Sequence, residues 1–457
     1  MKKVPWYVSP PAVFVFSLVS IIAAIAFYIY WAVKAQIGIE EFLEKFNLTS
    51  DPLLEFNTWV TILVYSILFG IVLIGLIVLV ALVVPMSTNI KAISIKNIVA
   101  AILVMFIFGF ILLNDYVAGF FEVISAGVAK LSSATADGTS FVFGSLFEEH
   151  PYAFALNVLP LIIVMSTLSA LLWHWRVLPL VIKGLSYVCE KLFNLGGPIS
   201  FGAAANVFVG QVEAPLFVKP YLSKMSKKEL LILMTAGMAT VSGSVMIALA
   251  GVLENQFVGL NIVQHFLTAS ILSIPGAIMY AEIMYPSNDI THHMSDAKEE
   301  KIYAGSMDAI TKGTKDGLNI AVNVAAILIS ILALVSIVDG ALNLIITDLS
   351  LQKILGYIFA PICWLLGIPW SEAPSAAELL GLKLATNEFV AYIQLGELEP
   401  EFFTDRTKVI LLYALCGFAN FSSVGILISG IGAMAPERTN DLIDVSVKAL
   451  VGATLAS

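Results

Sequence analysis

The chain has 457 residues, of which 59% are hydrophobic and only 12% are charged. Soluble domains carry about 25% charged residues, so a chain of this composition cannot hide its apolar surface in a water-soluble core. The formal net charge of −9 argues against nucleic acid as a partner, because nucleic acid selects basic surfaces. We therefore expect an all-α polytopic membrane protein whose surface contacts the lipid bilayer.

Residues 1–56 are predicted to form an extra region at the N-terminus, before the part of the chain described below. The uncharged stretch from Val4 to Val33 is too long for the apolar core of a signal peptide, so we expect a retained transmembrane helix followed by an acidic outer loop. Lysines in the short loops, such as Lys91 and Lys96, fall on one side when the spans are counted. This asymmetry predicts a cytoplasmic N-terminus.

Residues 57–194 are expected to hold the first spans, interfacial helices and a scaffold span. Residues 117–147 are amphipathic and contain Gly127 and Gly138, which suggests an interrupted interfacial or re-entrant helix. Charge-free apolar runs that are long enough to cross the bilayer lie at 57–86, 97–113 and 153–173.

Two later stretches place carboxylates where lipid would otherwise be expected. Residues 195–222 contain Glu213 and residues 352–396 contain Glu388, and both stretches are rich in small and polar residues. A charge at the bilayer centre costs about 2.5–3.5 kcal/mol, so such residues face a pathway rather than lipid. We expect two re-entrant helical hairpins that enter the membrane from opposite sides.

The hairpins divide the remaining chain into three regions. The first, 195–285, joins its hairpin to a broken helix at 229–250 and a span at 261–285. The second, 286–338, is a cytoplasmic loop followed by a scaffold span. The third, 339–457, contains the second hairpin, a broken helix at 408–432 and a last helix at 442–457.

Short sequence matches relate the two halves of the chain. ALNV at 155–158 returns as AVNV at 321–324, and GMATVS at 237–242 returns as GFANFS at 417–422. Counting the crossings between them places the halves in opposite orientations across the membrane. Inverted repeats with interrupted helices are typical of secondary transporters.

Polar side chains gather in the hairpins and helix breaks without a fixed positive charge. The nearest basic residues, Lys219 and Lys383, are expected to reach an interface instead. Such a set suits a neutral solute with hydroxyl or amino groups, whereas a phosphate would need arginine. Phe418, Val245 and Leu318 could wall a flat ring. The polar candidates are Asn206, Gln211, Glu213, Thr240, Asn387, Glu388, Asn420, Ser422 and Ser423.

Several of these stretches resemble the signature motifs of the concentrative nucleoside transporter family. The motifs are AAANVFVGQVEAPLFVKPYL, TNEFVAYIQL and CGFANFSS, and the resemblance covers about residues 57–457. It implies a homotrimeric symporter in the inner cell membrane that imports nucleosides such as uridine, cytidine or adenosine. It also implies a fixed scaffold and a transport domain that moves like an elevator.

The resemblance further implies roles for individual residues. Gln211 and Glu213 would bind the nucleobase, with Val245 and Leu318 lining it. Val212 stands where relatives commonly have Thr or Ser, so one hydroxyl on the base side is lost. The ribose would be bound by Glu388, Asn420 and Ser423, with Phe418 packing nearby. Co-transported sodium would be held by Asn206, Thr240 and the carbonyls of Val209 and Val241.

Two alternatives to a sodium-coupled transporter remain open at this point. A proton could drive the same architecture, with Glu213 or Glu388 as the titrating group. A nucleoside-sensing membrane receptor is the alternative from a different class. An enzyme is not expected, because His174 and His265 lack partners at catalytic spacing and the three cysteines lie in apolar runs without CxxC spacing.

Overall fold

The computed structural model describes residues 80, 83–146, 154–253, 256–257, 260–287, 303–347 and 349–457. The predicted N-terminal region 1–56 and most of the predicted span 57–86 lie outside the described residues. Leu82–Trp364 and Ile368–Ser457 form one compact unit, to which all the elements below belong apart from the last residue of α15. Leu365–Gly367 belong to the other unit.

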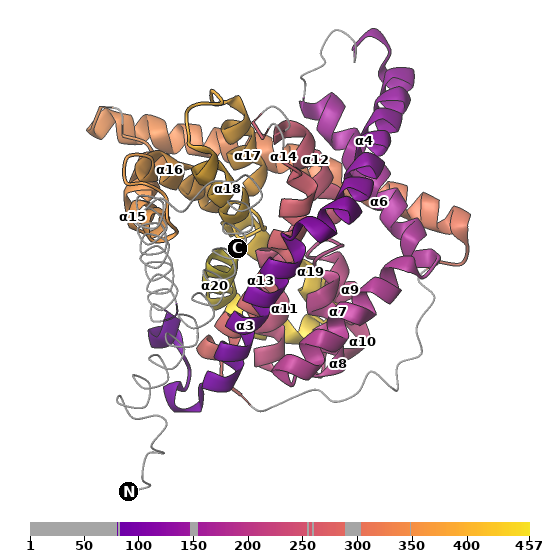
Figure 1. Ribbon diagram of the computed structural model, residues 1–457, viewed down its shortest axis with the longest axis vertical. Helices are drawn as coiled ribbons and strands as arrows, with labels where there is room; N and C mark the ends of the chain where they lie inside the picture. The colour runs from indigo at the N-terminus through magenta and orange to yellow at the C-terminus, as the bar shows by residue number, and fades with distance from the viewer. Residues whose placement is uncertain are drawn as a thin grey trace, which may run out of the picture. The chain divides into compact units, whose positions relative to one another are not determined.

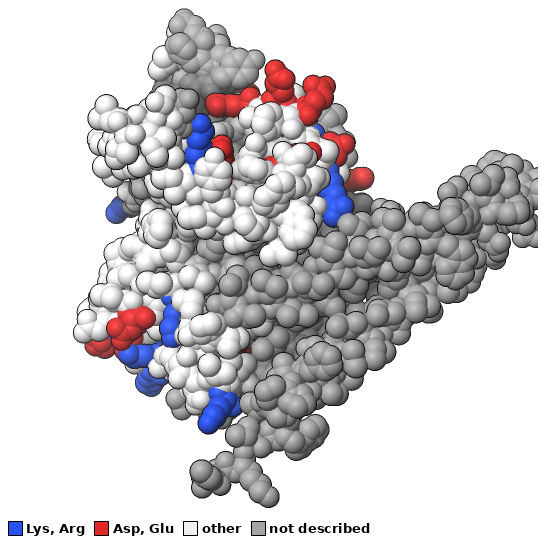
Figure 2. All heavy atoms as spheres, turned by 90° about the vertical axis from the view of Figure 1, so that its left-hand side faces the viewer, with Lys and Arg blue, Asp and Glu red and all other residues white. Residues whose placement is uncertain are grey.

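Every regular element in these ranges is helical, as the sequence predicts (Figure 1). Two helices, α3 (Ile95–Leu112) and α13 (Ile262–Met284), are long and apolar enough to cross a membrane. A bent pair, Val158–His174 with Val177–Phe193, adds a third candidate span, with 78° between its two parts. Among the residues coloured in Figure 2, charged side chains gather towards two ends of the face and few lie between them.

The helix that follows α3 is continuous, contrary to the interruption predicted from its glycines. α4 runs from Asp115 to Phe143 and includes both Gly127 and Gly138. An isolated glycine inside a helix costs only about 1 kcal/mol relative to alanine, and neither of these has another atom within 4 Å of an added Cβ. The two glycines therefore weaken α4 without ending it.

A long helix pair is joined by close backbone contact. α6 (Phe154–His174) and α14 (Ser306–Ile345) lie along each other, and α14 begins inside the loop predicted at 286–315. An added Cβ would lie 2.7 Å from Ile163 Cα at Gly317 and 2.9 Å from Thr167 Cα at Gly313. Glycine is required at these positions because the backbones touch.

The centre of the unit is α13, which contacts α3, α11 (Lys227–Ala239) and α20 (Thr439–Ala456) (Figure 1). Lys228 at the start of α11 forms a 2.7 Å ion pair with Glu282 of α13, and both side chains are buried. Asn97 of α3 donates to the same carboxylate at 2.6 Å. Removing one member of such a buried pair costs about 3–5 kcal/mol, so this cluster ties three helices together.

Two hairpins and two interrupted helices complete the part that positions the site. Hairpin 1 consists of α8, α9 and α10, and hairpin 2 of α16 and α17. The second hairpin begins later than predicted, because residues 352–365 belong to the separate helix α15. Each interrupted helix is a pair: α11 with α12, and α18 with α19. The bounds are α8 Gly197–Ala205, α9 Glu213–Phe217, α10 Lys219–Leu222, α12 Gly243–Leu253, α15 Leu351–Leu365, α16 Ala373–Ala385, α17 Glu388–Glu397, α18 Asp405–Ala414 and α19 Phe421–Met434.

The short and connecting elements are also helical. α7 (Val177–Phe193) follows α6 after Arg176, whose φ of 63° is left-handed. α7 packs on α8 of hairpin 1, as Figure 1 shows. The three-residue 3-10 helices are η2 Val84–Met86, η3 Ile90–Ala92 and η4 Pro436–Arg438.

The two interrupted helices touch at their breaks. Phe418 N donates to Thr240 O at 3.4 Å. Gly417 has a φ of +104°, and an added Cβ there would lie 2.7 Å from Ala239 O. Only glycine satisfies both the backbone conformation and the close approach, so the crossing depends on Gly417.

We therefore expect Gly417→Ala to destabilise the protein by about 1–3 kcal/mol, the cost of a strained backbone conformation. The apparent melting temperature of the purified protein in detergent measures this loss. Gly425→Ala on α19 is the matched control, because an added Cβ meets nothing within 4 Å there. Equal melting temperatures for the two variants would contradict the account of the crossing.

Candidate functional site

Glu388 lies buried at the tip of hairpin 2, in the first turn of α17. Asn387 precedes it as the N-cap, and its Oδ1 accepts from Val390 N at 3.1 Å. The Glu388 side chain is only 3% exposed. The unpaired N–H groups at a helix N-terminus favour a carboxylate nearby. The fold thus provides a helix end that can stabilise the Glu388 charge away from water.

Asn420 connects this carboxylate to the second interrupted helix. As the N-cap of α19, its Oδ1 accepts from Ser423 N at 2.8 Å and from Ser422 Oγ at 2.7 Å. Its Nδ2 donates to Glu388 Oε2 at 3.0 Å. Both faces of the amide are therefore engaged, and Asn420 is held in one orientation.

Gln211 at the tip of hairpin 1 extends this network. Its Nε2 donates to Ser423 Oγ at 3.1 Å. Hydrogen bonds thus lead from Gln211 through Ser423 and Asn420 to Glu388, joining the two hairpins across the start of α19. All four side chains are buried. The structure brings together four residues that the sequence assigns to one binding site.

Glu213 does not take part in that network. Its Oε2 accepts from Gly210 N at 2.7 Å, so the carboxylate folds back on its own hairpin tip. Burial raises the pKa of Tyr303 to about 12, with further contributions from Asp316 and Glu213.

The four apolar candidates lie on four different parts of the fold: hairpin 1, α12, α14 and the break between α18 and α19. Val212 contacts α19, where an added Cβ at Gly430 would lie 2.9 Å from its Cγ1. Val245 on α12 is 4% exposed, and Phe418 packs on the same apolar core. Leu318 is 50% exposed on α14.

Asn206 provides an oxygen that lacks a partner at the predicted sodium position. It caps the C-terminus of α8, and its Nδ2 donates to Gly202 O at 2.9 Å. Its Oδ1 is buried without a hydrogen-bond partner among the described residues. An added Cβ at Gly237 would lie 3.4 Å from this oxygen, so it faces the last turns of α11. A buried unpaired oxygen is rare in proteins and fits a bound cation.

Thr240 ties the end of α11 to the same position. Its Oγ1 lies 3.0 Å from both Asn206 O and Ala236 O. Val209 and Val241, whose carbonyls were assigned to sodium, are both buried. The oxygens gathered here are neutral and hard, and unwound helix ends offer such oxygens to alkali cations.

Lys383 contradicts the prediction that it reaches an interface. Its side chain is 2% exposed and its Nζ donates to Ala414 O at 3.0 Å and Cys416 O at 3.1 Å. The prediction was wrong because a lysine can be buried where helix-end carbonyls replace its hydration. The second basic residue, Lys219, is exposed.

Two further residues that hold hairpin 1 were not recognised from the sequence as contacts of the site. Arg438 donates to Ser223 O at 3.0 Å, just after α10, and its Nε forms a 2.8 Å ion pair with Asp441. Trp173 on α6 stacks on Phe217 with ring centroids 3.6 Å apart. The sequence around Arg438 and Trp173 gives only a weak indication of these contacts, because their partners in hairpin 1 lie far away in the sequence.

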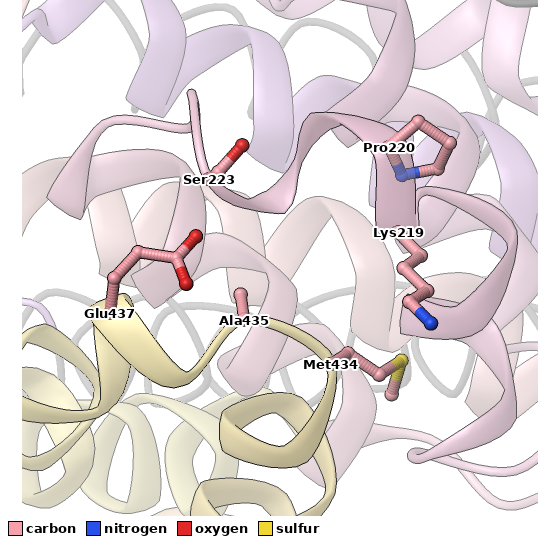
Figure 3. A pocket seen from close by; sticks show the side chains of 6 residues that line it. All are labelled: Lys219, Pro220, Ser223, Met434, Ala435 and Glu437. Atoms are coloured by element: carbon pink, nitrogen blue, oxygen red, sulfur yellow. The ribbon is translucent and has the colours of Figure 1, made fainter.

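A separate hollow of about 430 Å³ opens at the base of hairpin 1 (Figure 3). Lys219, Pro220 and Ser223 line one side, and Met434, Ala435 and Glu437 line the other. It shares no residue with the network between the hairpins. We therefore place the candidate site in the network, where buried polar groups converge, and not in this open hollow.

The three cysteines are buried free thiols, as expected. Within the described ranges no three His, Cys, Asp or Glu side chains gather as a metal site. The network between the hairpins is made of carboxylate, amide and hydroxyl groups, which act through hydrogen bonds.

Family models and known proteins match nearly the whole described chain. Residues 74–146 match the model of the Na+ dependent nucleoside transporter N-terminus, and residues 265–457 that of the C-terminus. Residues 155–256 match a nucleoside recognition model, the gate. The nucleoside permease NupC of Helicobacter pylori is 34% identical over 412 residues, which cover 86% of this chain and 96% of that protein.

Solved structures of CNTnw show the same fold in more than one state. CNTnw in an inward-facing, substrate-bound state aligns with a TM-score of 0.78 and 34% identity, covering 85% of this chain and 95% of that chain. An outward-facing variant of CNTnw aligns with a TM-score of 0.76 and 33% identity, covering 84% and 94%. The described helices are therefore those of a multi-pass membrane transporter.

We expect Asn420→Ala to destabilise the folded protein, because it leaves Glu388 and Ser423 N without their partner. Each buried group left unsatisfied costs about 1–3 kcal/mol. Ser429→Ala is the control, since that hydroxyl on the same helix is exposed and bonds only to carbonyls within α19. Thermal unfolding in detergent measures the stability of both variants. An Asn420→Ala melting temperature equal to that of the parent protein would contradict a stabilising role for the Asn420 hydrogen bonds.

Proposed function

The chain belongs to the concentrative nucleoside transporter family, and from that premise we propose that it imports nucleosides by sodium symport. The hydrogen-bonded series from Gln211 to Glu388 is the observation that carries the proposal. It spans two hairpins that are far apart in the sequence, and its members are carboxylate, amide and hydroxyl groups. These groups complement the amide-like edge of a base and the hydroxyls of a ribose.

The nucleobase end of the proposed site is hairpin 1. Gln211 presents an amide whose Oε1 is buried without a hydrogen-bond partner among the described side chains. A base N–H can satisfy that oxygen while the amide N–H donates in return. Glu213 lies two positions further along the tip, and Val212 contributes only apolar contact there. Val245 and Leu318 are proposed to line the flat faces of the base.

The ribose end is the tip of hairpin 2. One oxygen of Glu388 accepts from Asn420, and the remaining lone pairs of the carboxylate can accept ribose hydroxyl protons. Ser423 joins this end to Gln211, so its hydroxyl stands between the base and the sugar. Phe418 is proposed to pack beside the sugar, since it lies in the break that precedes Asn420.

Sodium is proposed as the coupled substrate, held by Asn206, Thr240 and the carbonyls of Val209 and Val241. The buried Asn206 Oδ1 supports this assignment, because a cation would supply the partner that it lacks. The same tip carries Gln211. A cation bound by Asn206 would therefore stabilise the tip in the position where Gln211 meets the base, and this couples the two substrates.

The transport cycle is proposed to be an elevator in a homotrimer built from inverted repeats, with the predicted region boundaries adjusted to the observed α14 and α15. The tight α6–α14 pair suits a fixed scaffold, and the hairpins with their interrupted helices suit the moving part. Several large apolar side chains on α14 are exposed and require lipid or another copy of the chain as a cover. They include Ile329, Leu334, Ile337 and Leu344.

Proton coupling is the second candidate for the driving ion. Glu213 and Glu388 are carboxyl groups at the two hairpin tips, and either could carry the proton through the cycle. The unpaired Asn206 oxygen favours sodium, because it could bind a sodium ion, whereas a proton carried by a glutamate would leave it without a partner.

Uptake of uridine, adenosine and guanosine into proteoliposomes, with and without a sodium gradient, tests the proposed function. We expect sodium-stimulated uptake of at least one of them, and Glu388→Gln should reduce it about tenfold or more by removing a charged acceptor. Nucleoside uptake that is independent of the sodium gradient and stops when a pH gradient is collapsed would assign the coupling to protons.

We expect Asn206→Ala to raise the sodium concentration for half-maximal uptake about tenfold or more, because a ligand oxygen is lost. Ser200→Ala is the matched control. Ser200 lies on the same helix, is fully buried and also lacks a hydrogen-bond partner among the described residues, but it is not a proposed ion ligand. Equal sodium dependence in the two variants would remove Asn206 from the ion site.

A further inference from the structure

Hairpin 2 carries a second buried charge that the binding of nucleoside and sodium does not use. The Lys383 ammonium donates to three oxygens: Ala414 O at 3.0 Å, Cys416 O at 3.1 Å and Ser457 Oγ at 3.0 Å. Three donors meet three acceptors, so the ammonium is fully hydrogen-bonded although it is 2% exposed.

The position of Lys383 is the meeting point of two helix C-termini. Lys383 lies in the last turn of α16, and Ala414 is the last residue of α18. A helix C-terminus carries roughly half a negative charge in the form of unpaired carbonyls. The carbonyls at the end of α18 and the hydroxyl of Ser457, the C-cap of α20, replace the hydration of the ammonium, which explains how this lysine is buried without an ion-paired carboxylate.

Hairpin 1 has the same pair of helix ends without a lysine. α8 ends before Asn206 and α11 ends before Thr240, and Thr240 Oγ1 donates to Asn206 O. Here the buried Asn206 Oδ1 has no partner among the described residues. One junction of helix ends therefore holds a covalently attached cation, and the equivalent junction holds an oxygen in need of one.

We propose that the Lys383 ammonium is a tethered cation that takes, at hairpin 2, the place that a mobile sodium ion takes at hairpin 1. This inference rests on the proposed function and adds to it that only one of the two junctions binds a transported ion. Lys383 is thereby a positioning residue for the ribose end of the site.

The positioning follows from the two contacts that hairpin 2 makes with one helix break. Lys383 binds the carbonyls at the end of α18, and Glu388 binds Asn420 at the start of α19. A cation thus meets the negative end of one helix and an anion meets the positive end of the next. Without the ammonium, the carbonyls of the break would lose their partner and Asn420 would no longer be held against Glu388.

Lys383→Ala tests the proposal, measured as uridine uptake in proteoliposomes against sodium concentration, with methylammonium added or absent. We expect uptake to fall about tenfold or more. Methylammonium should restore part of it, because the vacated junction can bind a small cation. Without the amine, sodium should occupy the junction, and the Hill coefficient for sodium should rise from about 1 towards about 2.

Lys408→Ala is the matched control for this experiment. Lys408 lies on α18, is 8% exposed and pairs with the exposed Asp405 at 2.9 Å, so it neutralises no helix C-terminus. We expect it to transport like the parent protein and to ignore methylammonium. Parental uptake and an unchanged Hill coefficient in Lys383→Ala would overturn the proposal.

Two measurements keep the outcome decisive if Lys383→Ala does not transport. The charge moved per uridine by the parent protein should be about one, and a value of two would overturn the single mobile cation. If the parent protein itself takes up no nucleoside, the proposed function fails, and this outcome is distinct from a failure of the tethered cation.

The tethered cation is then tested on purified Lys383→Ala without transport. Its melting temperature should rise with methylammonium and not with the larger tetramethylammonium, and equal effects of the two amines would overturn the proposal.

Discussion

The structure depends on how helices that end inside the protein satisfy their unpaired backbone groups. An interrupted helix leaves carbonyls at one end and N–H groups at the other, and both are costly to bury unpaired. The chain resolves this with side chains from distant elements: Asn387 and Asn420 cap the N-terminal ends, and Lys383 binds the carbonyls after α18. The same groups that stabilise the breaks also form the candidate site.

The two glutamates illustrate how similar sequence settings lead to different structural roles. Both begin a short helix at a hairpin tip, and the sequence treats them as a pair. Glu213 is satisfied locally by Gly210 N, whereas Glu388 is bound by Asn420 from another helix. Only Glu388 therefore belongs to the network that holds the two hairpins together.

Much of this arrangement could be predicted from the sequence, because its signals are local. Carboxylates in apolar stretches marked both hairpins, and the repeated GMATVS and GFANFS motifs marked both breaks. What the sequence could not show depends on contacts between distant elements. Lys383 looks like any lysine near a span until the end of α18 is placed beside it.

The glycine seam between α6 and α14 sets the mechanical character of that pair. At Gly313 and Gly317 main chain rests on main chain, so no layer of flexible side chains can absorb a displacement. α14 has 40 residues, a rod of about 60 Å. A methyl group added at Gly313 or Gly317 would push α14 away from α6 near its N-terminal end. Because α14 is long, a small tilt there would move its C-terminal end by a larger distance. The close fit of the pair therefore depends on the absence of a side chain at these two positions.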